Sequence, residues 1–192
     1  MEKKIIERKM FMGGNTSQGF VGFYDQIVDM YDLRKMYILK GSSGSGKSTF
    51  IKNFVNSIMK TDTLNSHKVI TINWIYCSQD PNSYDGVIIK ELGLGIIDGT
   101  FPHIVDPKYP GIIEEFIDLT QFIDVNKIRD KEQRVKEISK KKKEHFKQAY
   151  KYLQLAKQEH DKIEAIYTPC IDFKKIDKLL VKLIADLSIS EK

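Results

Sequence analysis

The chain has 192 residues, about the length of one domain, and 41% of them are hydrophobic, which is enough for a packed core and excludes a disordered chain. Lysine and arginine number 31 against 26 aspartate and glutamate, but the positive surplus is local. The segment from Lys127 to Glu164 holds 13 basic and seven acidic residues, whereas the remainder holds 18 and 19. This distribution argues against nucleic-acid binding through general basicity.

Targeting and redox signals are absent from the sequence. No apolar run approaches the roughly 20 residues that span a bilayer, and the charged start from Met1 to Arg8 lacks the apolar stretch of a signal peptide. Cys77 and Cys170 lie far apart and form no metal-binding spacing with each other or with the four histidines. We therefore expect a cytoplasmic protein with reduced thiols and no membrane contact.

Glycine and proline divide the chain into two regions. Eleven of the twelve glycines precede Gly111, and residues 112–168 contain neither glycine nor proline. This second stretch is rich in lysine, glutamate, glutamine, alanine and leucine, which favour helix. We predict an α/β core over 1–124 and a helical region over 125–192.

Four short apolar runs in the first region have the composition of buried strands. They lie at 36–39, 68–76, 94–98 and 116–119. An apolar face at helical spacing predicts a helix over 48–59, and a shorter helix is expected over 84–92. Another helix is expected over 23–31, with Thr16 or Ser17 as its N-cap. The alternation predicts a mainly parallel sheet with right-handed crossovers.

The helical region has a seven-residue repeat. Apolar residues recur from Ile128 to Ile163 at multiples of seven positions, and Lys142 interrupts the series. One continuous helix over 127–167 would extend about 60 Å. A helical hairpin, or an arm that pairs with another subunit, is equally compatible. A further amphipathic helix is predicted over 173–187. We expect the region to form an arm, lid or hairpin that packs back on the core.

The segment from Gly41 to Thr49 fits the phosphate-binding pattern G-x-x-x-x-G-K-[ST]. The predicted nucleotide-binding residues are Gly41, Ser42, Ser43, Gly44, Ser45, Gly46, Lys47, Ser48 and Thr49. Glycines let backbone N–H groups approach phosphate oxygens, and the following helix directs its positive end at the same anion. Lys47 is the predicted catalytic cation, and Ser48 is a predicted Mg²⁺ ligand. With a strand before it and a helix after it, the loop predicts the three-layer α/β/α fold of P-loop NTPases.

Carboxylates and a histidine follow the predicted strands. Asp98 ends the strand at 94–98, as a Walker B aspartate should, and is the predicted catalytic carboxylate and second Mg²⁺ ligand, with Asp80 as a competitor. His103 and Asp106 are candidates for orienting a substrate or for acid–base work, as are Asp80 and Asp85 for substrate contact, because ligands bind at the carboxyl ends of strands. Local turn roles are the alternative for these residues.

Several short motifs in one order resemble a poorly characterised family of bacterial P-loop ATPases, often described as nucleotide-kinase-like. They are Asn15-Thr16, Gly19-Phe20, the 41–49 loop, Asp85-Gly86-Val87, Asp98-Gly99-Thr100, Pro102-His103 and Asp106-Pro107. The stretch 96–103 is also similar to the Asp-Gly-Phe-Pro-Arg segment of adenylate kinases, with Thr100 inserted and His103 in place of the arginine. The resemblance covers residues 10–130 and implies ATP binding. Family members are longer and carry a second P-loop half, so the chain is expected to be a single-domain relative or a truncated first half.

The leading interpretation is a Mg²⁺-dependent, ATP-binding P-loop protein that acts as an NTPase or a kinase-like phosphotransferase on an unknown small-molecule or protein acceptor. The alternative is a non-catalytic, ATP-dependent switch that signals through the helical arm, which could also carry self-association. Gly99 stands where many ATP-hydrolysing motors have a glutamate, and the chain has only four arginines for clamping phosphates. We interpret the Lys140–Lys143 run as a solvated helix face rather than a nucleic-acid site.

Overall fold

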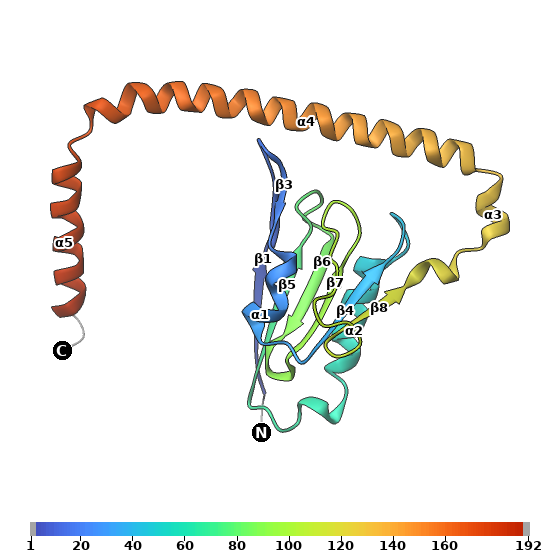
Figure 1. Cartoon of the computed structure of the whole chain (residues 1–192). Helices are drawn as coiled ribbons and strands as arrows, with labels where there is room; N and C mark the ends of the chain where they lie inside the picture. The colour runs from blue at the N-terminus through green and yellow to red at the C-terminus, as the bar shows by residue number, and fades with distance from the viewer. Residues whose placement is uncertain (1–2, 190–192) are drawn as a thin grey trace.

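The computed structural model describes residues 3–189, so the ends of the two predicted regions, 1–2 and 190–192, lie outside the described residues. Its centre is a six-stranded sheet in the order β1-β5-β6-β7-β4-β8 (Figure 1). The strands are β1 (Lys4–Met10), β4 (Lys35–Lys40), β5 (Val69–Tyr76), β6 (Tyr84–Ile89), β7 (Leu94–Asp98) and β8 (Glu114–Asp118). All run parallel except β6, which is antiparallel to both neighbours. The α/β class and the mainly parallel sheet are confirmed.

Two helices cover opposite faces of the sheet because alternate strand residues point to opposite sides. Helix α1 (Ile27–Tyr31) buries Ile27 and Val28 in one apolar cluster, with side chains from β4 to β7. Helix α2 (Lys47–Ile58) buries Ile51 and Val55 in a second cluster, with the intervening side chains of the same strands. The predicted helix over 48–59 and the strands β4, β5, β7 and β8 are confirmed.

The predicted helix over 84–92 is wrong. Residues 84–89 form β6, and only a single 3₁₀ turn over Lys90–Leu92 follows. A short apolar run fits a buried helix or a buried strand equally well by sequence, and here hydrogen bonding to β5 and β7 decides. Glycine at position 86 allows β6 to pair closely with β7, because a Cβ there would lie 2.8 Å from the Ile96 carbonyl oxygen.

The N-terminal segment also differs from expectation. The charged strand β1 was not predicted, because edge strands tolerate charge and carry little apolar signal. Residues 13–22 form a hairpin of β2 (Gly13–Thr16) and β3 (Gly19–Gly22). Within its turn the Thr16 hydroxyl donates to the Gly19 carbonyl at 2.8 Å and accepts from the Gln18 amide at 3.1 Å. The predicted N-cap role of Thr16 or Ser17 is therefore wrong.

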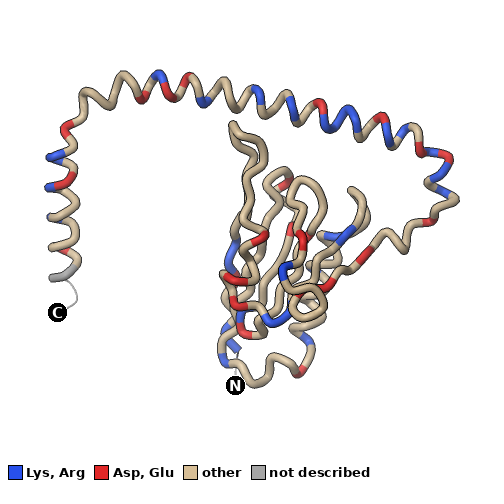
Figure 2. Tube along the Cα trace, viewed as in Figure 1, with Lys and Arg blue, Asp and Glu red and all other residues tan. Residues whose placement is uncertain are grey.

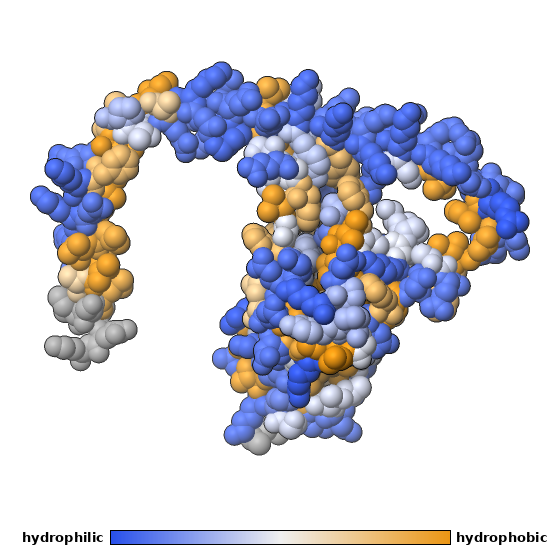
Figure 3. All heavy atoms as spheres, in the orientation of Figure 1, coloured by the Kyte–Doolittle hydropathy of each residue, from blue (hydrophilic) through white to orange (hydrophobic). Residues whose placement is uncertain are grey.

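The region after the sheet contains three helices, α3 (Val125–Arg129), α4 (Glu132–Tyr167) and α5 (Phe173–Ile189). Helix α4 is one continuous helix rather than a hairpin, and it crosses above the β2–β3 hairpin and the neighbouring loops (Figure 1). Basic residues recur along it (Figure 2). Helix α5 stands away from the sheet with its side chains exposed over 173–187, and apolar atoms gather along it (Figure 3). The expected return of the helical region onto the core is thus limited to α4.

The remaining short elements are 3₁₀ turns. They are η1 (Tyr24–Gln26), η2 (Asp62–Leu64), η3 (Lys90–Leu92), η4 (Leu119–Phe122) and η5 (Thr168–Cys170). Among the described helices, none is both long and apolar enough to cross a bilayer.

Replacing Gly86 with alanine distinguishes the observed strand from the helix that the sequence suggests. In a helix, alanine would stabilise by about 1 kcal/mol. In β6 we expect a loss of about 1–3 kcal/mol in the free energy of unfolding, because the new methyl group crowds a backbone oxygen. Urea titration measures the difference, and Gly14→Ala, where nothing lies within 4 Å of the added Cβ, is the matched control. A stabilised Gly86→Ala protein would contradict the placement of β6.

Candidate functional site

A cavity of about 410 Å³ lies where β4 and β7 end, beside the N-terminus of α2. It is lined by residues 43–49, Cys77, Gln79, 83–85, Asp98, 100–103 and Lys142. The register of the parallel pair β4 and β7 sets Leu39 beside Asp98, so the segment after β4 and the end of β7 meet at one edge of the sheet. The sequence motif and the predicted Asp98 are thus brought to the same cavity.

The glycine-rich loop (Gly41–Gly46) makes a tight turn between β4 and α2. A Cβ on Gly41 would lie 2.5 Å from the Ser45 hydroxyl oxygen, so only glycine fits there without a shift. Gly44 and Gly46 have φ of +82° and +86°, a left-handed conformation that side chains with a Cβ rarely adopt. The Ser45 hydroxyl is buried without a hydrogen-bond partner in the described structure. The loop is therefore shaped for close approach of its backbone to a ligand.

Lys47, the first residue of α2, folds back over this loop. Its ammonium donates to the carbonyl oxygens of Gly41 at 2.8 Å and Ser42 at 3.0 Å. It also lies 3.5 Å from Asp98 Oδ2, and the two side chains are only 10% and 12% exposed. Of the nine residues predicted to bind nucleotide, 43–49 line the cavity, whereas Gly41 and Ser42 meet it through these carbonyl bonds.

Ser48 and Asp98 both line the cavity and both carry side-chain oxygen atoms. The Ser48 hydroxyl oxygen accepts the Tyr84 amide at 2.9 Å, which leaves it a second lone pair. Asp98 Oδ1 accepts from the amide and hydroxyl of Thr100, at 2.9 and 2.6 Å, which fixes the carboxylate while Oδ2 faces Lys47. Carboxylate and hydroxyl oxygens are ligands that Mg²⁺ accepts. The donor set therefore fits the predicted cation.

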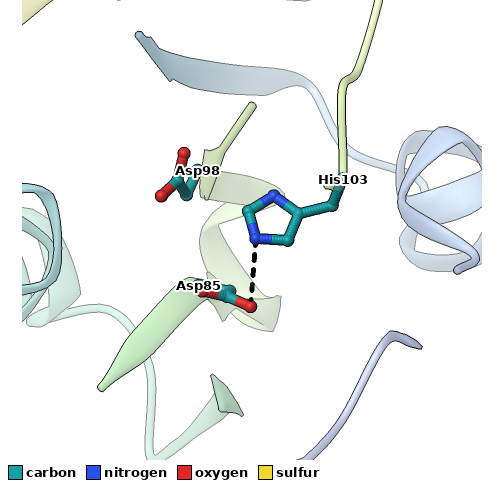
Figure 4. A group of neighbouring side chains, drawn as sticks. All are labelled: Asp85, Asp98 and His103. Atoms are coloured by element: carbon teal, nitrogen blue, oxygen red, sulfur yellow. Dashed lines mark ion pairs between the residues drawn. The ribbon is translucent and has the colours of Figure 1, made fainter. Parts of the chain in front are cut away.

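A buried histidine–aspartate pair, Asp85 and His103, lines the cavity, and Figure 4 shows the two side chains with Asp98. The antiparallel register of β6 and β7 pairs Gly86 with Ile97, so Asp85 falls opposite Asp98. His103 Nε2 lies 3.2 Å from Asp85 Oδ2, and the Tyr24 hydroxyl donates to the same oxygen at 3.2 Å. Asp85, Asp98 and His103 are 4%, 8% and 7% exposed. In Figure 4 the imidazole lies between the two carboxylates, with one nitrogen toward Asp85.

The loop that carries His103 is held in place from several sides. Lys40 at the end of β4 donates to the carbonyl oxygens of Gly99 at 2.7 Å and Val105 at 3.3 Å. Val105 is buried in the cluster beneath α1. The imidazole packs against Tyr24, with ring centroids 4.8 Å apart, and meets Phe20 edge to face, with ring centroids 6.0 Å apart. The histidine is thus fixed in orientation.

Asp85 controls the protonation of His103. Burial lowers the pKa of this imidazole, but the hydrogen bond to Asp85 and the charge of that carboxylate outweigh it, and Asp98 adds to them, so the net shift is upward. Burial and Asp85 likewise raise the pKa of the Tyr24 hydroxyl. In the neutral imidazole, Asp85 favours the proton on Nε2, since a carboxylate only accepts. Nδ1 is then left as an acceptor, and it is buried without a partner in the described structure.

The same three residues could hold a metal ion. One ligand atom from each of Asp85, Asp98 and His103 lies within 4.8 Å of the others, and all three residues are buried. The oxygens suit Mg²⁺, whereas the imidazole suits a transition metal better. Of the two candidate donor sets, Ser48 with Asp98 is the one composed of oxygen alone.

Two predicted substrate residues are not brought to the cavity. Asp80 is exposed in a turn, where its carboxylate accepts the Asn82 amide at 3.0 Å, and Asp106 is exposed on the loop after His103. Neither lines the cavity.

Conversely, sequence reasoning gave no site role to Tyr24 or to Lys142. The only signal for Lys142 was its interruption of the seven-residue repeat, and Tyr24 carried none. Both cysteines are free thiols.

Comparisons with protein-family models, with curated proteins and with solved structures found no match to the chain. Function is therefore inferred from the residues and geometry of the cavity.

Replacing Asp85 with asparagine tests the electrostatics of the pair. We expect the pKa of His103, measured by NMR titration, to fall relative to the wild-type protein, because the charge and the acceptor that raise it are removed. In the wild type, protonated His103 stabilises the fold fully below its unfolded pKa of about 6.5, and the contribution is lost as pH rises through the higher folded pKa. Asp80→Asn, in an exposed turn, should leave the titration unchanged. An identical His103 pKa in both variants would refute the pairing.

Proposed function

We propose that the protein binds Mg·ATP at the glycine-rich loop and cleaves or transfers the γ-phosphoryl group, with the P-loop NTPase fold as its framework. The observation that carries the proposal is the convergence of Lys47 and Asp98, 3.5 Å apart, in a cavity formed by the glycine-rich loop and the start of α2. This pairs a phosphate-binding cation with a carboxylate at the position of a Walker B aspartate.

Phosphate binding would exchange one set of Lys47 contacts for another. The ammonium donates to two loop carbonyls, and phosphate oxygens would take over these hydrogen bonds. The positive φ at Gly44 and Gly46 supports the approach of backbone amides to the same oxygens. Most of the stabilisation of a phosphoryl-transfer transition state comes from such positioning and charge neutralisation.

Ser48 and Asp98 are the residues that would hold Mg²⁺. When bound, the ion neutralises charge on the β- and γ-phosphates. Asp98 is pre-oriented by its two bonds from Thr100, and Ser48 by the bond from the Tyr84 amide. Both side chains are therefore held before a ligand arrives, which lowers the entropy lost on binding.

His103 is the candidate general base, a role that Gly99 leaves open where hydrolysing motors have a glutamate. Asp85 accepts from Nε2 and leaves Nδ1 to take a proton from water or from the hydroxyl of an acceptor. An imidazole acts as a base only when neutral, so turnover should rise with pH through the pKa of His103. The Tyr24 hydroxyl would keep Asp85 in orientation.

A non-catalytic switch is the second candidate. The observation that favours it is Lys142, which lines the cavity from α4, the helix that leads to the exposed α5. In that case ATP would bind without turnover, and α4 would transmit its presence.

Removing the Lys47 ammonium tests the nucleotide site itself. We expect Lys47→Ala to weaken Mg·ATP binding about tenfold to a hundredfold in calorimetric titration, because hydrogen bonds to charged groups contribute about 1.5–3 kcal/mol each. Lys52→Ala, an exposed lysine on the same helix, is the control and should bind like the wild type. Equal affinity of the Lys47 and Lys52 variants for Mg·ATP would contradict nucleotide binding at the glycine-rich loop.

Replacing His103 with glutamine tests the catalytic step. Phosphate release from Mg·ATP, alone and with a panel of nucleotides and small metabolites, should fall about 10²- to 10⁴-fold while ATP affinity is retained. His160→Gln, exposed on α4, should keep the wild-type rate and its rise with pH. If the His103 variant keeps the wild-type rate at every pH, His103 is not the general base. If the wild-type protein binds ATP tightly but does not turn it over, the non-catalytic switch is favoured over the enzyme.

A further inference from the structure

Helix α4 forms part of the wall of the cavity that holds the glycine-rich loop. Lys142 lines this cavity, and it also lines two others, of about 220 and 540 Å³. The 220 Å³ cavity separates the glycine-rich loop from α4 directly, with Gly41 and Ser43 on one side and Ser139 and Lys142 on the other. The helix therefore lies over the proposed phosphate site.

One stripe of α4 faces the core. Lys142, Phe146 and Tyr150 are four positions apart and so share a face. Phe146 and Tyr150 are the described α4 residues over 141–150 that are partly buried. The Tyr150 hydroxyl donates to Asn15 Oδ1 at 2.9 Å, and Asn15 in turn donates to the Ser78 carbonyl at 3.4 Å, next to Cys77 in the cavity wall. The helix is thus anchored to the wall of the site.

Lys142 is a cation placed where the helix otherwise repeats apolar residues. It stands seven positions after Val135 and seven before Ala149. Lys136, Lys157 and Lys162 form ion pairs within α4, whereas Lys142, like the other lysines of the 140–143 run, has no side-chain ion pair or hydrogen bond within residues 3–189. What distinguishes Lys142 within that run is that it lines the cavity of the glycine-rich loop. An ammonium without a protein partner, over the proposed phosphate site, has the chemistry to bind an anion there.

The charge of the cavity also calls for another cation. Asp85 and Asp98 contribute two carboxylates to its lining, and against them the core contributes Lys47 as its only lysine or arginine, together with His103, which Asp85 already pairs. A triphosphate would add further negative charge, and arginine is absent from the lining. Lys142 is the second lysine at the cavity, and it comes from the segment that carries the positive surplus.

An aromatic pair of rings flanks the smaller cavity. Phe146 from α4 and Phe101 from the loop after β7 both line the 220 Å³ space. Phe101 is 59% exposed and Phe146 is partly buried. A nucleobase gains about 1–3 kcal/mol by stacking on an aromatic side chain. Lys142 lies on the same helix face one turn before Phe146, so phosphate and base contacts would come from one stripe.

From these observations we infer that α4 completes the nucleotide site, with Lys142 binding phosphate and Phe146 stacking on the base. This rests on the proposed function, since the ligand is the nucleoside triphosphate at the glycine-rich loop. The helix is then a binding element of the site.

The phosphate contact is tested with the full chain and two neighbouring lysines. We expect Lys142→Ala to weaken calorimetric binding of both ATP and inorganic tripolyphosphate about five- to tenfold, as a half-exposed ion contact allows. Lys142→Arg should retain affinity. Lys140→Ala removes the same charge from the same lysine run at a position that lines none of the three cavities, and should bind like the wild type.

The base contact is tested by separating base from phosphate. Phe146→Ala should weaken ATP binding about tenfold while leaving tripolyphosphate affinity at the wild-type value. Tyr152→Ala, 72% exposed on the same helix, is the aromatic control and should change neither. Circular dichroism should show unchanged helix content for every variant, because surface substitutions on a helix cost little.

The outcomes separate this inference from the proposed function. Equal ATP affinity of the Lys142 and Lys140 alanine variants, in a protein whose Lys47→Ala variant loses ATP, would overturn the role of Lys142 and leave the glycine-rich loop intact. Loss of tripolyphosphate along with ATP in Phe146→Ala would overturn base stacking. Failure of the wild type to bind ATP at all would overturn both proposals together.

Discussion

Strand β6 runs against its neighbours, and this single reversal determines which side chains meet at the cavity. In an otherwise parallel sheet the strands end at the same edge, where Asp98 follows β7 and the glycine-rich loop follows β4. Because β6 is reversed, its beginning lies at that edge too, and it delivers Tyr84 and Asp85 there. The Tyr84 amide then holds Ser48, and Asp85 holds His103. The core on both sides of the sheet depends on the same central strand.

The buried charged groups at the cavity are stabilised by ion pairs and hydrogen bonds with one another and with neighbouring polar groups. An isolated charge in a dry interior is costly, and charged side chains are rarely buried unless they are paired and hydrogen-bonded. Asp98 is bonded to Thr100 and faces Lys47, whereas Asp85 accepts from His103 and Tyr24. Asn73 Oδ1 in β5 is one of three buried polar atoms without a partner in the described chain. The other two, the Ser45 hydroxyl and His103 Nδ1, belong to residues that line the cavity. Unsatisfied groups of this kind are rare in folded proteins, and here they flank the space that a ligand would enter.

The sequence predicted correctly those elements whose structure depends on residues close together in the chain. The glycine-rich loop, α2 and β7 follow from adjacent residues, because turn geometry, helical spacing and a short apolar run each act over a few positions. The direction of β6 could not be predicted in this way, since Val87 to Ile89 reads equally as helix or strand until its neighbours are known. Tertiary packing alone brings Tyr24 to Asp85 and His103, and Lys142 to the cavity, and periodicity does not encode such packing. Asp80 and Asp106 carried the right chemistry, but both are exposed in loops and lie outside the cavity lining.

Because α4 is long, a small tilt of the helix at the cavity would move its far end by a larger distance. The helix is fixed to the core near Tyr150, and its 17 further residues to Tyr167 extend about 25 Å beyond that point before α5 begins. A tilt of about 10° around the Asn15 contact would sweep the far end through roughly 4 Å, which is close to the rise of one helical turn. The anchor between Tyr150 and Asn15 on the β2–β3 hairpin would be the pivot of such a tilt. Helix α5, with its exposed apolar side chains, follows the end of α4 that lies far from this pivot.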